Sequence, residues 1–257
     1  MEVIKITANE YLNHRYSIVR IFSSIPPEDE EFVSKWREAQ DDAIEFLSEL
    51  YGRELKLRGT IKISLTQTLF GKLPVIDTEN HDDFTILAAW LMNQPKEDLP
   101  LTVNAFTIPA KIKNERHRII LLNRAPYSNV PAEKLSLTAE EWLEKSHALR
   151  LRHESAHYET LRLFCQMKNH ALDEIIADTL GQIAAFGNFD ADRQRLFFGL
   201  EKGGAKCTGR LQFYCQKVSP PERPKIYAAV DKFLDTIEVA GKSELQILCE
   251  LAGRRLV

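Results

Sequence analysis

The longest stretch of uninterrupted helical pattern in the chain is TAEEWLEKSHALRLRHESAHYETLRLFCQM, residues 138–167. The stretch contains neither proline nor glycine, and Thr138 and Glu141 at its start have the spacing of a capping box. Apolar side chains recur along it at helical spacing. They include Trp142, Leu149, Leu161 and Phe164. The pattern predicts one long helix from Thr138 to about Met167.

The middle of this predicted helix contains the sequence His153-Glu154-Ser155-Ala156-His157. Two histidines four residues apart lie one turn apart on the same face of a helix. Their rings can therefore both bind one zinc ion, at about 2.0–2.1 Å. In such a motif Glu154 does not bind the metal but faces the metal-bound water and takes its proton. We predict a metal site here; the alternative is a chance motif whose histidines are exposed or satisfied by protein partners.

A second predicted helix, from about Leu172 to Phe186, supplies the candidate third ligand. Glu174 and Asp178 lie one turn apart on it, and the residues between them are apolar. A catalytic zinc site needs three protein ligands and an open fourth position, so Glu174 is the candidate for the third. The alternative is that the two carboxylates form a solvated stripe, or cap the start of the helix near Asp173, although Asp173 alone could serve as the cap.

The two motifs together resemble the signature of the gluzincin metallopeptidases. HExxH followed on the next helix by Glu-x-x-x-Asp is typical of thermolysin-like peptidases, and Glu174-Ile175-Ile176-Ala177-Asp178 is similar to the ExxAD of the CAAX prenyl protease and heat-shock membrane protease family. The resemblance implies a zincin-like fold in which His153, His157 and Glu174 bind zinc. It also implies that Asp178 hydrogen-bonds a zinc-binding histidine, as ligating imidazoles require of a neighbouring carboxylate or carbonyl.

A weaker part of the resemblance is Asn104-Ala105-Phe106, in a predicted strand before the helix of the HExxH motif. In both families an Asn-Ala-aromatic sequence lies on the edge strand that holds an extended peptide substrate, which would make these three residues substrate-binding. The chain also departs from those families. The interval from His157 to Glu174 is shorter than usual, and the chain has no apolar run long enough to be a transmembrane segment.

The remaining elements place strands mainly in the first half of the chain and helices in the second. The predicted strands are Tyr16–Phe22, Thr60–Leu65, Leu101–Ile108 and Arg118–Asn123, and the further predicted helices are Glu28–Tyr51 and Asp82–Met92. From Asp190 onward the pattern is helical, with breaks at Gly203–Gly204 and at Pro220, Pro221 and Pro224. We therefore predict an α+β fold in a single domain of residues 1–257. Its mixed lobe is 1–130, with a small sheet, and its helical lobe is 131–257, with the metal site.

The composition limits the classes of function. The chain has 257 residues, 44% of them hydrophobic and 28% charged, with a net charge of −3, so it has no general attraction to nucleic acid or to an anionic membrane. Its four cysteines have no CxxC spacing and do not suggest a disulfide framework. Met1–Arg15 lacks the apolar region of a secretory signal. We expect a reduced, cytoplasmic protein without membrane or nucleic-acid partners.

These observations lead to three functional hypotheses. The first is a zinc-dependent hydrolase, a peptidase that acts on a peptide or protein substrate, with Glu154 as the general base. The second is a catalytically silent zinc-binding protein of zincin fold that regulates or binds peptides. The third is a helical protein with an accidental HExxH. A dinuclear site that uses Glu144 and His147 also stays open, as do the oligomeric state and four candidates for stabilising an oxyanion. These are His170, Arg210, Tyr214 and Tyr227.

Overall fold

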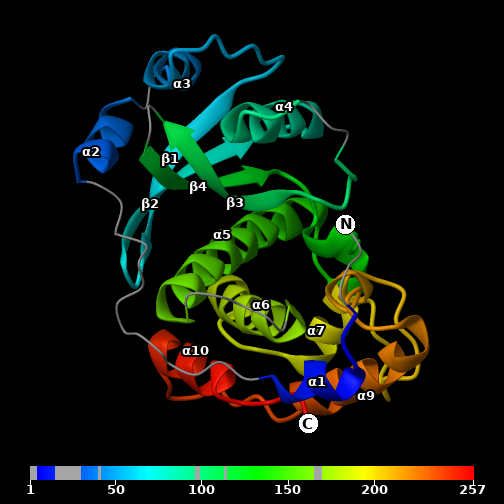
Figure 1. The fold of residues 1–257 in the computed structure, drawn as a ribbon. Helices are drawn as coiled ribbons and strands as arrows, with labels where there is room; N and C mark the ends of the chain where they lie inside the picture. The colour runs from blue at the N-terminus through cyan, green and yellow to red at the C-terminus, as the bar shows by residue number, and fades with distance from the viewer. Residues whose placement is uncertain (1–4, 15–29, 40–41, 96–98, 113–114, 165–169) are drawn as a thin grey trace.

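The computed structural model describes residues 5–14, 30–39, 42–95, 99–112, 115–164 and 170–257 (Figure 1). The predicted α+β class is confirmed, because a mixed sheet from the first half of the chain packs against helices from the second. Its strands are β1 (Ile61–Thr68), β2 (Gly71–Thr78), β3 (Ala105–Ile112) and β4 (Glu115–Asn123). The strand order is β1-β2-β4-β3, with β2 and β4 parallel and the other pairs antiparallel. Strand β3 therefore forms one edge of this sheet.

Alternating side chains of β4 give the two faces of the sheet different partners. Ile119 and Leu121 face a cluster that includes residues of α2 (Glu30–Glu38), α3 (Ala43–Tyr51) and α4 (His81–Met92). Ile120 and Leu122 face the opposite way and pack with Tyr158 of α5 (Ala139–Phe164). This period of two is what a strand covered on both faces requires. It places the long helix α5 directly under the sheet (Figure 1).

The helices of the second half surround a separate apolar core below α5. They are α6 (His170–Phe186), α7 (Ala191–Phe198), α8 (Leu211–Tyr214), α9 (Arg223–Leu234) and α10 (Glu244–Ala252). Short 3₁₀ turns occupy Tyr127–Asn129, Ala132–Leu135 and Pro220–Glu222. Helix α6 lies against α5 on the side away from the sheet (Figure 1). Among the described residues, no helix is both long and apolar enough to cross a membrane.

The N-terminal helix α1 (Ala8–Asn13) packs with the helical half and not with the sheet. Tyr11 is fully buried there; its hydroxyl donates to the backbone oxygen of Tyr214 at 2.9 Å and accepts from the backbone N–H of Ala171 at 2.9 Å. The backbone N–H of Leu256 donates to the backbone oxygen of Leu12. Residues 5–13 thus pack with the helical half and contact the C-terminal segment. The predicted division had placed them in the mixed lobe, 1–130, with the sheet.

Most of the predicted elements are present, with some differences. The prediction of one helix over Glu28–Tyr51 is wrong, because Asp42 accepts a hydrogen bond from the backbone of Glu45 and caps a new helix, α3. The prediction of a strand beginning at Leu101 is also wrong, since β3 begins at Ala105. Strand β2 was missed because Gly71 and Pro74 are typical of turns. The predicted strand Tyr16–Phe22 lies outside the described residues.

Helices α5 and α6 approach each other closely at small residues. Ala156 and Ala177 are fully buried, and a Cβ atom added to Gly181 would lie 2.8 Å from the backbone oxygen of Leu149. No side chain fits at that distance without a shift of the backbone. Glycine at this position therefore sets the distance between the helix that carries the HExxH motif and the helix that carries Glu174.

We expect Gly181→Ala to destabilise the protein. Alanine favours a helix over glycine by about 1 kcal/mol, but the clash with Leu149 has the overpacking cost of about 1–3 kcal/mol. The net loss is up to about 2 kcal/mol, and Gly181→Ser should lose more. Denaturant unfolding of the three proteins measures this order. A more stable Gly181→Ala variant would contradict the close approach of the two helices.

Candidate metal centre

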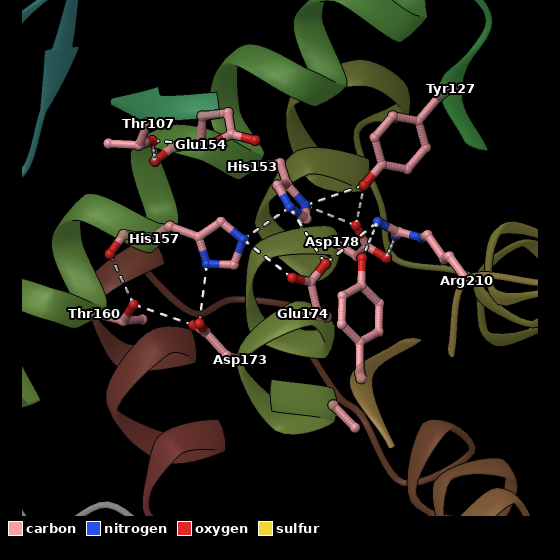
Figure 2. Close-up of polar contacts among 12 residues, drawn as sticks. Thr107, Tyr127, His153, Glu154, His157, Thr160, Asp173, Glu174, Asp178 and Arg210 are labelled. Carbon is pink, nitrogen blue, oxygen red and sulfur yellow. Dashed lines mark hydrogen bonds and ion pairs between the residues drawn. The ribbon is translucent and has the colours of Figure 1, made fainter. Parts of the chain in front are cut away.

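The structure brings together the side chains of His153, His157 and Glu174, from α5 and α6 (Figure 2). The Nε2 atoms of the two histidines lie 2.9 Å apart. Glu174 Oε2 is 3.5 Å from Nε2 of His153, and Oε1 is 3.5 Å from Nε2 of His157. One ligand atom from each residue lies within 4.8 Å of the other two, so the three side chains could hold one metal ion. The geometry follows from the i, i+4 spacing of the histidines and the close packing of α6.

A carboxylate lies behind each of the two histidine rings. Nδ1 of His153 is 2.8 Å from Oδ1 of Asp178, and Nδ1 of His157 is 3.2 Å from Oδ2 of Asp173. An ionised carboxylate can only accept, so each Nδ1 carries the hydrogen. When the rings are neutral, both Nε2 atoms then present lone pairs, 2.9 Å apart. Two lone pairs at that distance repel each other unless a proton or a metal cation lies between them.

The charges around the histidine pair are mostly negative. Although burial raises the pKa of Glu174, the histidines and Arg210 lower it to about 2. Burial likewise raises the pKa of Asp178, yet Arg210 and His153 hold it well below its usual range. Burial lowers the pKa of the His157 ring, but the carboxylates of Asp173 and Glu174 raise it well above its usual value. These carboxylates therefore favour a proton on His157, which a divalent cation would displace.

Asp178 is completely buried and hydrogen-bonded on both oxygens. Oδ1 accepts from Nδ1 of His153 and from the hydroxyl of Tyr127 (Figure 2), while Oδ2 accepts from Gln194 and Arg210. The Tyr127 hydroxyl is also 3.1 Å from Nδ1 of His153. These contacts fix the orientation of the carboxylate and, through it, that of the ring. Sequence reasoning paired Asp178 with a histidine but did not identify Tyr127 or Gln194, whose positions carry no motif.

Asp173 has a different role from the cap that the sequence suggested as an alternative. Helix α6 begins at His170, so Asp173 lies within its first turn. Its Oδ2 contacts His157, and its Oδ1 accepts from the hydroxyl of Thr160 at 3.2 Å. The interpretation of Glu174 and Asp178 as a solvated stripe is also wrong, because Asp178 is fully buried and the Glu174 side chain is 13% exposed.

Glu154 lies next to the histidine pair but outside the group of candidate ligands. Its Oε2 accepts from the hydroxyl of Thr107 at 2.9 Å, and the same hydroxyl contacts the Glu154 backbone oxygen at 3.1 Å (Figure 2). Thr107 belongs to the edge strand β3. Glu154 as a whole residue is 7% exposed, and its carboxylate is turned toward the sheet. This arrangement leaves Glu154 free of a ligand role.

The Asn104-Ala105-Phe106 sequence lies at the start of the edge strand, where its two larger side chains pack internally. Asn104 is buried; its side chain donates to the Leu101 backbone oxygen at 2.8 Å and accepts from the Asn123 amide at 2.7 Å. The Phe106 ring stacks on Phe84 with centroids 5.6 Å apart. Contact with a substrate by these residues stays a prediction, and Thr107 is the neighbour that reaches the candidate site.

The four candidates for oxyanion stabilisation lie in different places. Arg210 Nη1 is 3.3 Å from Glu174 Oε2 and 3.4 Å from the Tyr214 hydroxyl, so these two residues border the cluster. His170 is half-buried at the start of α6, and burial lowers its pKa. Tyr227 packs in the core of the helical half.

The pair considered for a dinuclear site lies apart from the ligand group. Glu144 is exposed, and His147 Nε2 is 2.7 Å from Oδ1 of Asp77. Within the described part of the chain, His153, His157 and Glu174 form the group that could hold a metal, and it includes neither Glu144 nor His147. The geometry thus favours a mononuclear site over a dinuclear one.

Removal of the Asp178 carboxylate should weaken metal binding. Asp178→Asn keeps the size of the side chain but removes the negative charge that stabilises the Nδ1–H of His153, so we expect about 10–100-fold lower affinity for zinc. Asp77→Asn is a matched control, because Asp77 contacts His147 outside the candidate site. Zinc titration of both variants tests this. Equal affinities in Asp178→Asn and the wild type would show that this contact does not support a metal ligand.

Metal affinity should rise with pH. The pKa of His157 is raised in the metal-free protein, so below that pKa a metal must displace a proton from the ring. Each displaced proton makes the apparent affinity rise about tenfold per pH unit, and the dependence flattens above the raised pKa. Asp173→Asn removes a carboxylate that raises the pKa, so its plateau should begin at a lower pH. Zinc titration from about pH 6 to about pH 9 measures both curves, and a flat wild-type curve would contradict the proton on His157.

Comparison with known proteins identifies a family. A family model described as a family of unknown function (DUF7005) matches residues 90–242, more than half of the chain. The matched segment runs from α4 to the loop after α9 and contains the three candidate ligands with Glu154, Asp178 and Arg210. No curated protein and no solved structure matches the chain. The chain belongs to the DUF7005 family.

Proposed function

We propose that the protein is a zinc-dependent hydrolase, a peptidase that uses Glu154 as the general base. One observation carries the proposal: two histidine Nε2 atoms lie 2.9 Å apart, and a carboxylate behind each ring directs its lone pair toward the other. Glu174 completes the group, and Glu154, which follows His153 in the chain and bonds Thr107, is not part of it. A zinc site with a purely structural role does not require an additional acidic residue such as Glu154.

The donor set suits zinc better than calcium or magnesium. Two imidazole nitrogens and one carboxylate oxygen are a ligand set of catalytic zinc sites, in which a fourth position stays open for water or substrate. Calcium and magnesium prefer sites built from oxygen atoms, and this group has two nitrogen donors. The buried carboxylates of Glu174 and Asp178, both with lowered pKa values, add the negative charge that a dication requires.

The protein side of the reaction depends on Glu154. Zinc, when bound, lowers the pKa of a water molecule and polarises the carbonyl of the scissile amide. Thr107 holds Oε2 of Glu154 by a hydrogen bond of 2.9 Å, which orients the carboxylate for proton transfer. Glu154 takes a proton from the attacking water and passes it to the nitrogen of the leaving amine. Arg210 and Tyr214 border the cluster.

The resemblance of residues 153–178 to gluzincins supports an amide substrate, a peptide or protein. The edge position of β3 among the described strands is consistent with this choice, because an extended peptide can pair with an edge strand. The expectation of a cytoplasmic protein without membrane or nucleic-acid partners is part of the same proposal.

One observation favours the second candidate, a silent zinc-binding protein that holds a peptide. The Glu154 carboxylate accepts a hydrogen bond from Thr107 and is buried, so it could serve to fix α5 to the sheet. Both candidates require the same metal ligands. They differ only in whether Glu154 transfers a proton.

Glu154→Gln separates the two candidates. Glutamine keeps the shape of the side chain and can still bond Thr107, but it cannot accept a proton. The variant should bind zinc like the wild type and lose cleavage by about 10²–10⁴-fold. Glu144→Gln is the matched control, because Glu144 is an exposed residue of the same helix. Zinc content and cleavage of a mixed peptide library are measured side by side.

The outcomes of this experiment are distinct. Zinc in all three proteins, with cleavage by the wild type and Glu144→Gln but not by Glu154→Gln, supports the peptidase. Equal cleavage by Glu154→Gln would show that Glu154 is not the base. Zinc binding by the wild type without cleavage of any peptide in the library would favour the silent protein.

A further inference from the structure

Arg210 links Glu174 to the residue that orients His153. Its Nη1 lies 3.3 Å from Oε2 of Glu174, and its Nη2 donates to Oδ2 of Asp178 (Figure 2). A guanidinium is charged at every relevant pH. One oxygen of the candidate ligand Glu174 therefore faces a permanent protein cation before any metal binds.

Three aromatic rings hold the Arg210 guanidinium in place. Its central carbon is 4.9 Å from the ring centroid of Tyr127, 5.2 Å from that of Phe198 and 5.9 Å from that of Tyr214. Such contacts stabilise a desolvated guanidinium. Its Nε is buried and has no hydrogen-bond partner among the described residues, so the two Nη groups carry its polar contacts. The group is thus fixed where its Nη atoms reach Glu174 and Asp178.

The backbone before Arg210 also has little freedom. A Cβ atom added to Gly209 would lie 2.6 Å from the backbone oxygen of Phe198 and 2.9 Å from Cα of Gly199. The backbone N–H of Thr208 donates to the Gly199 oxygen at 2.8 Å. The segment that carries Arg210 is therefore packed backbone to backbone against the end of α7, which positions the side chain beside α6.

The position of Arg210 makes the two oxygens of Glu174 unequal. Each oxygen lies 3.5 Å from a histidine Nε2, so the distances to the rings do not distinguish them. Arg210 contacts Oε2 and not Oε1. A carboxylate oxygen that is held by a fixed cation is a poorer donor to a second cation, because the two positive charges repel each other.

We propose that Arg210 makes Glu174 a ligand through one oxygen: Arg210 retains Oε2 and leaves Oε1 for the metal. This inference rests on the proposed zinc function and deepens it. A carboxylate bound through both oxygens would occupy two coordination positions. Limited to Oε1, Glu174 occupies one and leaves the open position that catalysis requires. Arg210 is a positioning residue, since it acts on the metal through Glu174.

The test compares metal coordination in the wild type, in Arg210→Gln and in Arg254→Gln. Arg254 is a matched control, because its guanidinium lies 4.3 Å from the Phe233 ring and hydrogen-bonds Thr236, outside the candidate site. Each protein is loaded with Co²⁺, whose visible absorption is weaker when a fifth ligand is added. We expect equal spectra for the wild type and Arg254→Gln, and clearly weaker absorption for Arg210→Gln, in which both Glu174 oxygens can bind.

A measurement on the wild type alone avoids any question of whether a variant folds. X-ray absorption spectroscopy of the zinc-loaded protein should detect a carboxylate bound through one oxygen. Binding through both oxygens, or a Co²⁺ spectrum of Arg210→Gln identical to that of the wild type, would overturn the role of Arg210 and leave the zinc function standing. A wild type that takes up neither metal would overturn the zinc function itself.

Discussion

The close contact of α5 with α6 is the constraint on which the candidate site depends. Gly181 lies against the backbone of Leu149, and the buried Ala156 and Ala177 keep both helix surfaces small. This packing brings Glu174 within 3.5 Å of the histidine rings on the facing helix. The sheet above α5 adds Thr107, which fixes Glu154. The site thus forms where one helix lies between a sheet and a second helix.

Polar side chains that are buried between the sheet, α5 and α6 need partners, because an unpaired buried charge is costly. Asp178 shows how the fold meets this need: it accepts from Tyr127, His153, Gln194 and Arg210, which come from four different segments. Tyr127 lies in a 3₁₀ turn before α5, and Arg210 lies just before α8. The helical half therefore contributes more than packing, since it supplies Gln194 and the guanidinium of Arg210, which hold the Asp178 carboxylate.

The sequence was sufficient to predict the α+β class, both helices of the site and the convergence of the HExxH motif with Glu174. Those features depend on local periodicity and on spacing within one helix. It was not sufficient for the contacts of Tyr127, Gln194 and Arg210 with Asp178, because these contacts join residues far apart in the chain and leave no local pattern. Arg210 was named only as a candidate for stabilising an oxyanion. Asp173 was seen only as a possible cap, and its contact with His157 depends on how α6 is rotated.

The errors at the level of the fold have similar physical causes. Strand β2 contains Gly71 and Pro74, which local propensity assigns to a turn, yet pairing with β1 and β4 stabilises it as a central strand. The division of Glu28–Tyr51 into two helices depends on Asp42, whose side chain caps the second. Strand pairing thus determined the conformation of β2, and the Asp42 cap determined where α3 begins. The hydrophobic periodicity of the sequence alone does not specify either feature.

The central claim is that the pair of histidines and Glu174 hold a zinc ion. Elemental analysis of protein purified without chelator, repeated after zinc is offered and excess removed, tests it most directly. The geometry predicts about one zinc per chain, and none in a variant that carries both His153→Ala and His157→Ala. A wild type with no bound metal, or a double variant that keeps its zinc, would contradict the claim.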